Sequence, residues 1–115
     1  MSHKNLFTIT NQPLFCVYVL ECEKGKYYVG STMKYYLERR FQEHKDGSGS
    51  KWTNQFKPIR IIKTIEHLNS QEAYSRETDE CKRIMREHND IQICRGGRYM
   101  FPFGSDWWNH GILDK

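Results

Sequence analysis

The sequence predicts a small α+β domain, in which a three-stranded, mainly antiparallel sheet is flanked by helices and covered by an aromatic C-terminal tail. Two stretches rich in β-branched and aromatic residues flank a short turn, a third such stretch follows later, and two segments show helical periodicity. In chain order these segments are 15–22, 26–32, 35–45, 59–65 and 69–88. With 115 residues and no visible repeat or linker, we expect one domain over 1–115, with a core at 15–88 and an extension at 89–115.

The register of the predicted hairpin decides which side chains share a face of the sheet. Glu23-Lys24-Gly25 has the features of a three-residue loop in which Gly25 is left-handed. In that case Tyr18 and Tyr28 lie on one face, and Gly30, opposite Tyr18, leaves space for a close approach to the backbone. The predicted pairs are Cys22 with Lys26, Leu20 with Tyr28, and Tyr18 with Gly30.

Residues 35–45 are predicted to form the first helix. Leu37 and Phe41, four residues apart, face the core. Arg40 and His44 border this apolar stripe on the same side of the helical wheel. We therefore expect these two polar side chains at the edge of a cleft.

The segment 45–57 is rich in glycine, serine and lysine, which predicts a flexible basic loop before the third strand. Lys51, Trp52 and Lys57 are candidates for contacts with nucleic acid. An ordinary solvated connection is the alternative for this loop.

The second helix is predicted to begin after Asn69, because Asn69 and Glu72 have the spacing of a capping box, and to extend to His88. Glu77 falls near the middle of its apolar stripe. A buried, unpaired carboxylate costs on the order of several kcal/mol, so Glu77 needs a cation, a metal ion or hydrogen-bond donors. A structural salt bridge, for example to Arg40, is the alternative to a functional role. The stripe consists of Ala73, Tyr74, Cys81, Ile84 and Met85.

The tail is rich in aromatic residues and glycine. Residues 91–94 are predicted to form a short strand or an extended segment. The aromatic residues at 101–103 and 107–108 are expected to pack over the core in preference to stacking on bases. Arg95 and Arg98 are candidates for phosphate contacts.

Composition restricts the class of protein. The net charge of +4 and the pI of about 8.9 favour a polyanionic partner without establishing one. The four cysteines form no CxxC pair, so we expect free, buried thiols. No apolar run approaches the roughly 20 residues that span a bilayer, and a signal peptide is not recognisable, so we expect an intracellular protein of the cytoplasm or nucleus.

The order and spacing of the singled-out residues resemble the GIY-YIG nuclease superfamily. Cys16-Val17-Tyr18 is similar to the first motif, with valine for isoleucine and no leading glycine, and Tyr28-Val29-Gly30 is similar to the second. The segment from Arg40 to His44 matches the Arg-x-x-x-His motif, and Glu77 matches the family's acidic residue. Further similar segments are Lys51-Trp52-Thr53 with Pro58, and the turn Arg95-Gly96-Gly97, which resembles one in some virus- and phage-encoded members.

The resemblance implies a metal-dependent endonuclease that hydrolyses DNA phosphodiester bonds, with one Mg²⁺ or Mn²⁺ on Glu77. Arg40 would clamp the scissile phosphate and stabilise the transition state. Tyr18 would be the general base, with Tyr28 and His44 positioning the phosphate or the water, and the two tyrosines could exchange roles.

Three further residues enter through the same resemblance. Lys26 and Lys34 are candidates for phosphate contact or for assisting the base. Family members often use a polar residue after the glutamate helix, commonly asparagine, and Asn89 is the candidate here.

The expected partner is duplex or branched DNA, with neither a membrane nor a small-molecule cofactor. We see no zinc finger, helix-turn-helix or basic extension, which leaves recognition of DNA structure, low sequence preference or a homodimer. Two alternatives stay open. A nucleic-acid-binding module on the same scaffold would bind DNA without cutting it, and a small zinc-stabilised interaction domain would contain zinc on metal analysis.

Overall fold

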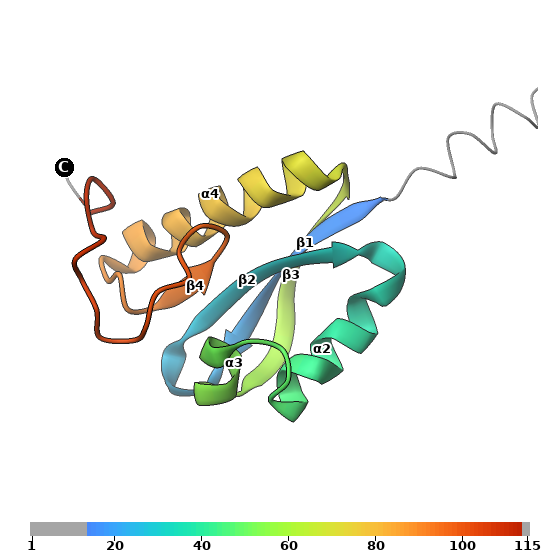
Figure 1. Ribbon diagram of the computed structural model, residues 1–115, viewed down its shortest axis with the longest axis horizontal. Helices are drawn as coiled ribbons and strands as arrows, with labels where there is room; N and C mark the ends of the chain where they lie inside the picture. The colour runs from blue at the N-terminus through green and yellow to red at the C-terminus, as the bar shows by residue number, and fades with distance from the viewer. Residues whose placement is uncertain (1–13, 114–115) are drawn as a thin grey trace, which may run out of the picture.

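The computed structural model describes residues 14–113 and contains one sheet of four strands in the order β3-β1-β2-β4 (Figure 1). The strands are β1 Phe15–Cys22, β2 Tyr27–Met33, β3 Pro58–Leu68 and β4 Cys94–Gly96. β1 is antiparallel to β2 and β3, whereas β4 is parallel to β2. The α+β class is confirmed, but the prediction of three mainly antiparallel strands is wrong. The short strand or extended segment predicted at 91–94 overlaps β4 only at Cys94, and β4, at three residues, is too short to show a periodicity in the sequence.

The hairpin has the predicted register. Tyr18 is opposite Gly30 and Leu20 is opposite Tyr28, and the amide of Cys22 donates to the carbonyl oxygen of Lys26 at 2.7 Å. Gly25 has a φ of 72°, in the left-handed region that glycine favours. The local turn therefore sets the register, as the sequence predicts.

The helices are α2 Leu37–Asp46, α3 Lys51–Gln55 and α4 Ser70–His88, with short 3₁₀ turns at Glu23–Gly25 and Lys34–Tyr36. α3 lies inside the segment 45–57, which is predicted as a flexible loop. That prediction is therefore partly wrong. Ser50 caps α3, because its hydroxyl oxygen accepts from the amide of Thr53 at 3.1 Å. The capping box of α4 is confirmed: Asn69 and Glu72 exchange hydrogen bonds of 2.8 and 2.9 Å.

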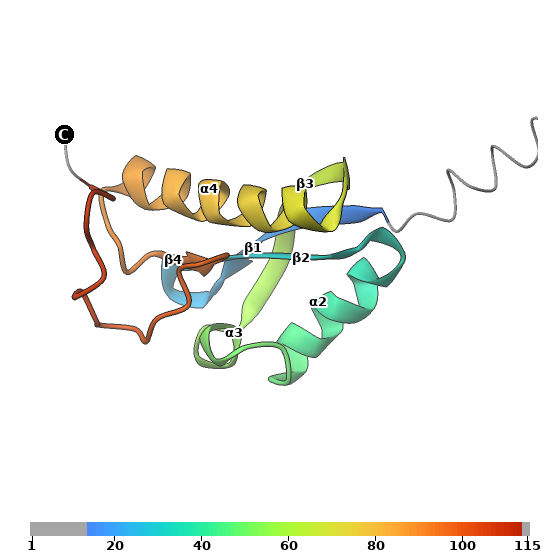
Figure 2. The same ribbon diagram turned by 45° about the horizontal axis from the view of Figure 1, so that its top comes forward.

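The helices cover opposite faces of the sheet, as Figure 2 shows: α4 lies on one face, and α2 and α3 lie on the other. Successive side chains of a strand point to opposite faces, so the core has two parts. Val17, Val19 and Val29 belong to the part beneath α4, and Tyr18 and Tyr28 belong to the part beneath α2 and α3. α4 crosses the sheet from the β3 edge to the β4 edge, which makes the parallel pairing of β4 with β2 possible (Figure 1).

The tail after β4 contacts both parts of the core. Tyr99 and Trp108 pack with the α4 side, whereas the ring of Phe103 lies 5.2 Å from that of Phe56 on the α3 side. Trp107 is 67% exposed, so the predicted packing of the aromatic tail holds for only some of its residues. Tyr74, assigned to the apolar stripe of α4, is also exposed.

Two general expectations about the chain can be compared with the structure. Cys16, Cys22, Cys81 and Cys94 are all free and buried, as predicted. Among the helices within residues 14–113, none has the length and apolar character needed to cross a membrane.

Candidate active site

The two tyrosines share the sheet face that α2 and α3 cover. Their ring centroids are 6.5 Å apart, and both side chains are buried. Gly30 lies against them, because a Cβ atom there would be 2.5 Å from the hydroxyl oxygen of Tyr18. The space left by this glycine is therefore occupied by the tyrosine hydroxyl itself.

His44 is fully buried on α2 and connects Tyr18 to α3. Its Nε2 lies 2.8 Å from the hydroxyl oxygen of Tyr18, and its Nδ1 lies 2.8 Å from Oγ1 of Thr53. The Thr53 hydroxyl has two other acceptors for its proton, the carbonyl oxygen of Ser50 at 3.3 Å and the hydroxyl oxygen of Ser50 at 2.9 Å, so it is free to accept from Nδ1–H. This arrangement leaves Nε2 unprotonated and able to accept from Tyr18. Gly49 packs flat against the imidazole, where a Cβ atom would overlap the ring.

Burial controls the protonation of these three groups. Burial, and then Arg40, lowers the pKa of His44 to about 4, so the imidazole is neutral at pH 7. Burial, and then Glu77, raises the pKa of Tyr28 to about 12. The pKa of Tyr18 is raised further, chiefly by burial and then by Tyr28, while Arg40 opposes the increase. Both phenols are therefore protonated at pH 7 and lie beside a neutral acceptor.

Arg40 lies half-buried at the margin of this cluster. One Nη donates to Oε1 of Glu43 at 2.9 Å and the other donates to the carbonyl oxygen of Gly49 at 3.2 Å. Its guanidinium also lies within hydrogen-bonding reach of the Tyr18 hydroxyl. A guanidinium has five N–H donors, so these contacts fix its plane and leave donors for an anion.

Glu77 reaches the site from the opposite face of the sheet, where α4 lies (Figure 2). Its carboxylate accepts from the hydroxyl of Ser31 on β2 and from the backbone of Gly97. Burial raises its pKa, and these hydrogen bonds oppose the increase. Among residues 14–113 no ion pair includes Glu77, and Arg40 is paired with Glu43 instead. The alternative of a Glu77–Arg40 salt bridge is therefore wrong.

Glu77 contacts the strand that carries Tyr28, at a point where the sheet ends. β4 pairs only with the segment 27–29 of β2, so β2 has no further partner strand at Gly30 and Ser31 among the described residues. After burial, the negative charge of Glu77 is the next cause of the raised pKa of Tyr28, and it is a minor cause of the raised pKa of Tyr18. The carboxylate thus lies at the open edge of β2, the strand that also carries Tyr28.

The donor set near Glu77 restricts which metal would fit. In the described part of the chain, no three His, Cys, Asp or Glu side chains lie together to hold an ion. A partly buried carboxylate with no cationic partner suits an ion that keeps most of its water ligands, as Mg²⁺ does. A zinc site of several protein ligands does not fit these residues.

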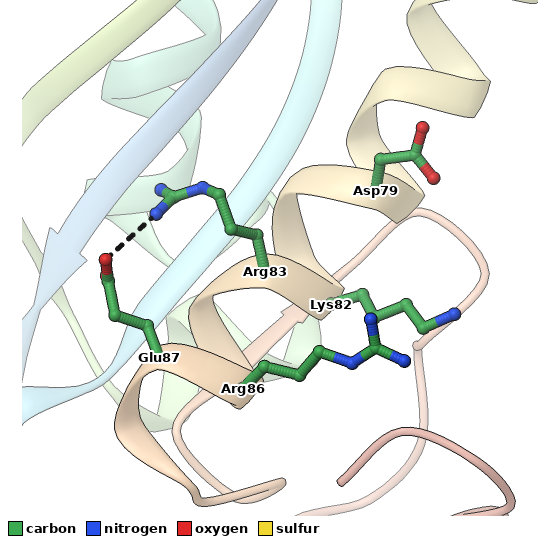
Figure 3. Close-up of a pocket in the computed structure, with 5 residues that line it drawn as sticks. All are labelled: Asp79, Lys82, Arg83, Arg86 and Glu87. Atoms are coloured by element: carbon green, nitrogen blue, oxygen red, sulfur yellow. Dashed lines mark hydrogen bonds and ion pairs between the residues drawn. The ribbon is translucent and has the colours of Figure 1, made fainter. Parts of the chain in front are cut away.

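A cleft of about 710 Å³ opens beside the tyrosine cluster. It lies between the active-site residues, the segment around α3 and the tail. Its lining contains cations and no acidic residue. A second hollow, of about 560 Å³, lies on the outer face of α4 and is lined by Asp79, Lys82, Arg83, Arg86 and Glu87 (Figure 3). There Arg83 pairs with Glu87 at 3.3 Å, so this hollow has mixed and partly self-neutralised charge.

The other residues predicted to contact nucleic acid fall into two groups. Lys51 lines the cleft and Arg98 is exposed, so both are accessible to a phosphate. The remaining lysines have protein partners. Lys26 lies 4.9 Å from the ring of Phe103, Lys34 pairs with Glu66 at 3.1 Å, and Lys57 donates to Asn54 at 3.0 Å.

Trp52 and Arg95 have structural roles in place of the predicted contacts with nucleic acid. The indole N–H of Trp52 donates to the carbonyl oxygen of Tyr27 at 2.8 Å, and its side chain is buried. Arg95 is 1% exposed, and its guanidinium lies between the rings of Trp52 and Trp108, at 4.6 and 4.7 Å. It donates to carbonyl oxygens of Phe101, Ile91, Cys94 and Pro102 and to Oε1 of Gln92.

Asn89 does not join the site. It terminates α4 in the left-handed conformation, with a φ of 52°. Twelve residues of helix separate it from Glu77, which is about 18 Å at 1.5 Å per residue. The polar residues that do contact the site are Ser31 and Thr53. Ser31 directly follows the second motif and Thr53 ends the similar segment Lys51-Trp52-Thr53, but small hydroxyl side chains give no signal of their roles there.

Comparisons with known proteins agree with this arrangement. The model of the GIY-YIG catalytic domain matches residues 14–90. A UPF0213 protein of Halalkalibacterium halodurans is 31% identical over 83 residues, covering 72% of this chain and 86% of the relative. A UPF0213 protein of Bacillus cereus is 29% identical over 74% of this chain and 85% of its own length. No solved structure matches. The family match spans both tyrosine strands, α2 and Glu77, and the chain belongs to the GIY-YIG family, a family of nucleases.

Proposed function

We propose that this protein is an endonuclease that hydrolyses DNA phosphodiester bonds with one divalent metal ion. One observation carries the proposal: the hydrogen-bonded pair of Tyr18 and His44 lies beside Arg40 and beside a carboxylate, Glu77, that has no cationic partner among residues 14–113. Phosphodiester hydrolysis develops negative charge on the phosphoryl group, so it needs a proton acceptor for water and fixed positive charge.

Tyr18 is the proposed general base, and His44 is the group that makes this possible. The phenol is protonated at rest, so it can take a proton from water only as it passes its own proton to Nε2 of His44. The water oxygen then forms a bond to phosphorus, the bond from phosphorus to the leaving oxygen breaks, and that oxygen takes a proton from solvent. Tyr28 lies 4.8 Å from the imidazole, ring centroid to ring centroid, and positions the phosphate.

Arg40 stabilises the transition state in this proposal. Its contacts with Glu43 and Gly49 hold the guanidinium in one plane, which lowers the cost of orienting it around a phosphate. Lys51 and Arg98 are the proposed contacts with flanking phosphates, because both are accessible.

Glu77 would hold the metal ion, either Mg²⁺ or Mn²⁺. When bound, such an ion supplies positive charge to the phosphoryl oxygens and lowers the pKa of its water. The hydrogen bonds from Ser31 and Gly97 orient the Glu77 carboxylate at the open edge of β2. This support leaves the side chain ordered before an ion arrives.

The test is cleavage of duplex, nicked, flapped, branched and single-stranded DNA with Mg²⁺ or Mn²⁺, by the wild type and by Glu77→Gln. The glutamine keeps the shape and removes the charge, so metal-dependent cleavage should disappear. Burial raises the pKa of Glu77, so its charged form destabilises the fold at pH 7, and Glu77→Gln should melt no lower than the wild type.

Glu80→Gln is the matched control, one turn further along α4. Glu80 pairs with Lys63 at 2.9 Å and Arg83 at 2.7 Å, and both cations are largely exposed. Glu80 itself is only 7% exposed, so losing its charge should cost more than an exposed pair does, about 1–3 kcal/mol of unfolding free energy, and should leave cleavage intact. Full activity of Glu77→Gln would overturn the metal assignment, and DNA binding by the wild type without cleavage would favour a non-catalytic binding module.

A further inference from the structure

The cleft beside the active site joins three distant parts of the chain. Tyr28 and Arg40 contribute from the tyrosine cluster, residues 49–52 and 55 contribute from around α3, and residues 100–103 contribute from the tail. The tail residues lie outside the part of the chain that matches the family domain, which ends at residue 90. This wall of the cleft is therefore a feature of the C-terminal extension.

The chemistry of the lining suits an anionic ligand that has a flat, apolar part. Arg40 and Lys51 provide positive charge, and no acidic side chain lines the cleft. Met100 is 48% exposed and Phe103 is 45% exposed, so part of each apolar side chain is available to a ligand. Lys26 lies over the Phe103 ring and adds a cation near this wall. The hollow on α4 lacks both properties, since its lining mixes acidic with basic residues and contains no aromatic residue (Figure 3).

Stacking on Phe103 requires a base that has left the double helix. A volume of about 710 Å³ lies within the usual range for small-molecule sites, about 300–1,000 Å³. A base pair in a duplex is covered on both faces by its neighbours, so its ring cannot reach Phe103. An unstacked base has free faces, and proteins bind such bases by stacking them on aromatic side chains.

We propose that this cleft binds one unpaired DNA base next to the phosphate that is cut. Because Tyr28 and Arg40 belong to both the cleft and the candidate active site, a nucleotide whose phosphate contacts Arg40 has its base beside the cleft wall. The inference rests on the proposed nuclease function and specifies its substrate: DNA that carries an extrahelical nucleotide, as in a bulge or a flap.

The test measures binding in the presence of EDTA, so that it does not depend on cleavage. Three fluorescent DNAs are compared by anisotropy: a matched duplex, the same duplex with a one-nucleotide bulge, and that bulge with an abasic site in place of the base. We expect the wild type to bind the bulge at least about fivefold more tightly than either other DNA, the lower limit for one base stacked on an aromatic ring.

Two variants locate this preference in the cleft. Phe103→Ala removes the exposed ring, and Met100→Glu adds a carboxylate at an exposed position where folding is not at risk. Both should abolish the preference for the bulge. Trp107→Ala removes an aromatic side chain that is 67% exposed in the same tail but does not line the cleft, and it should retain the preference. Thermal melting checks that each variant is folded.

The outcomes separate this inference from the proposed function. Equal affinity for the three DNAs, or a preference that persists in both cleft variants, overturns the inference even if Glu77-dependent cleavage is found. A preference that depends on Phe103 and Met100, without cleavage of any DNA, supports the base-binding cleft and refutes the nuclease proposal.

Discussion

The hydroxyl oxygen of Tyr18 and Nε2 of His44 are 2.8 Å apart in the interior, although 26 residues separate them in the chain. The pair joins β1 to α2, and Thr53 of α3 holds the far side of the imidazole. A buried neutral histidine between a phenol and a threonine hydroxyl is a directed chain of hydrogen bonds. The direction of these hydrogen bonds, from Tyr18 through His44 to Thr53, and the contacts around them have consequences that can be measured.

Tyr18→Phe tests the first link, because it removes only the hydroxyl. Nε2 of His44 then has no donor, which should cost about 1–3 kcal/mol of unfolding free energy. The cleavage rate should fall by about 10²–10⁴ if Tyr18 is the base. Tyr28→Phe is the comparison: a larger loss of kcat there would assign the base to Tyr28.

The pH dependence of stability tests the neutral state of His44. Its pKa is about 4 in the folded protein, below the ordinary value of 6.5, so the unfolded chain binds more protons between these two values. The contribution of His44 is fully present above pH 6.5 and is lost as the pH falls through about 4. Melting temperatures should decline more steeply over this window in the wild type than in His44→Gln, and equal slopes would contradict the depressed pKa.

Thr53 is a positioning residue for His44, and its contribution to cleavage can be separated from its contribution to packing. Thr53→Val keeps the shape but removes the acceptor for Nδ1–H of His44, so either ring nitrogen can then carry the proton. We expect kcat to fall with little change in KM, and the acid limb of the pH–rate profile to shift. Thr53→Ser restores the hydroxyl and should restore the profile, whereas a purely structural role would leave the profile of Thr53→Val unchanged.

Arg95 and Arg98 should differ sharply despite their proximity in sequence. Arg95→Ala removes five hydrogen bonds and the guanidinium between two tryptophan rings, so it should destabilise the fold by several kcal/mol, about 3 or more. Arg95→Lys should rescue little, because an ammonium lacks the planar fork. These losses are measured by thermal or urea unfolding.

Arg98→Ala is the matched comparison, because this side chain is exposed. Its melting temperature should stay within about 2 °C of the wild type, as for most surface substitutions. If Arg98 contacts a phosphate, the slope of log K against log salt for DNA binding should decrease by about 1. An unchanged slope would remove Arg98 from the DNA-binding surface.

The sequence by itself determined the local features. The Glu23–Gly25 turn sets the register of Tyr18 and Tyr28, and the capping box sets the start of α4, since both depend on residues only a few positions apart. The spacing of Arg40 and His44 placed both on the same side of one helix, but only Arg40 lines the cleft, because His44 is fully buried. Only the tertiary structure decided how these features meet.

Four relationships required the folded chain: α4 lies on the face opposite the tyrosines, Glu77 approaches them past the edge of β2, β4 is a fourth strand, and Arg95 is buried. Each depends on residues distant in sequence that pack together, and a helical wheel contains no information about which sheet face the helix covers. In the sequence, Arg95 lies beside two glycines, which predicts an exposed side chain. Its burial becomes evident only in the folded chain, where carbonyl oxygens and two tryptophan rings surround the guanidinium. Local spacing therefore fixed the candidate residues, and long-range packing fixed which of them share a site.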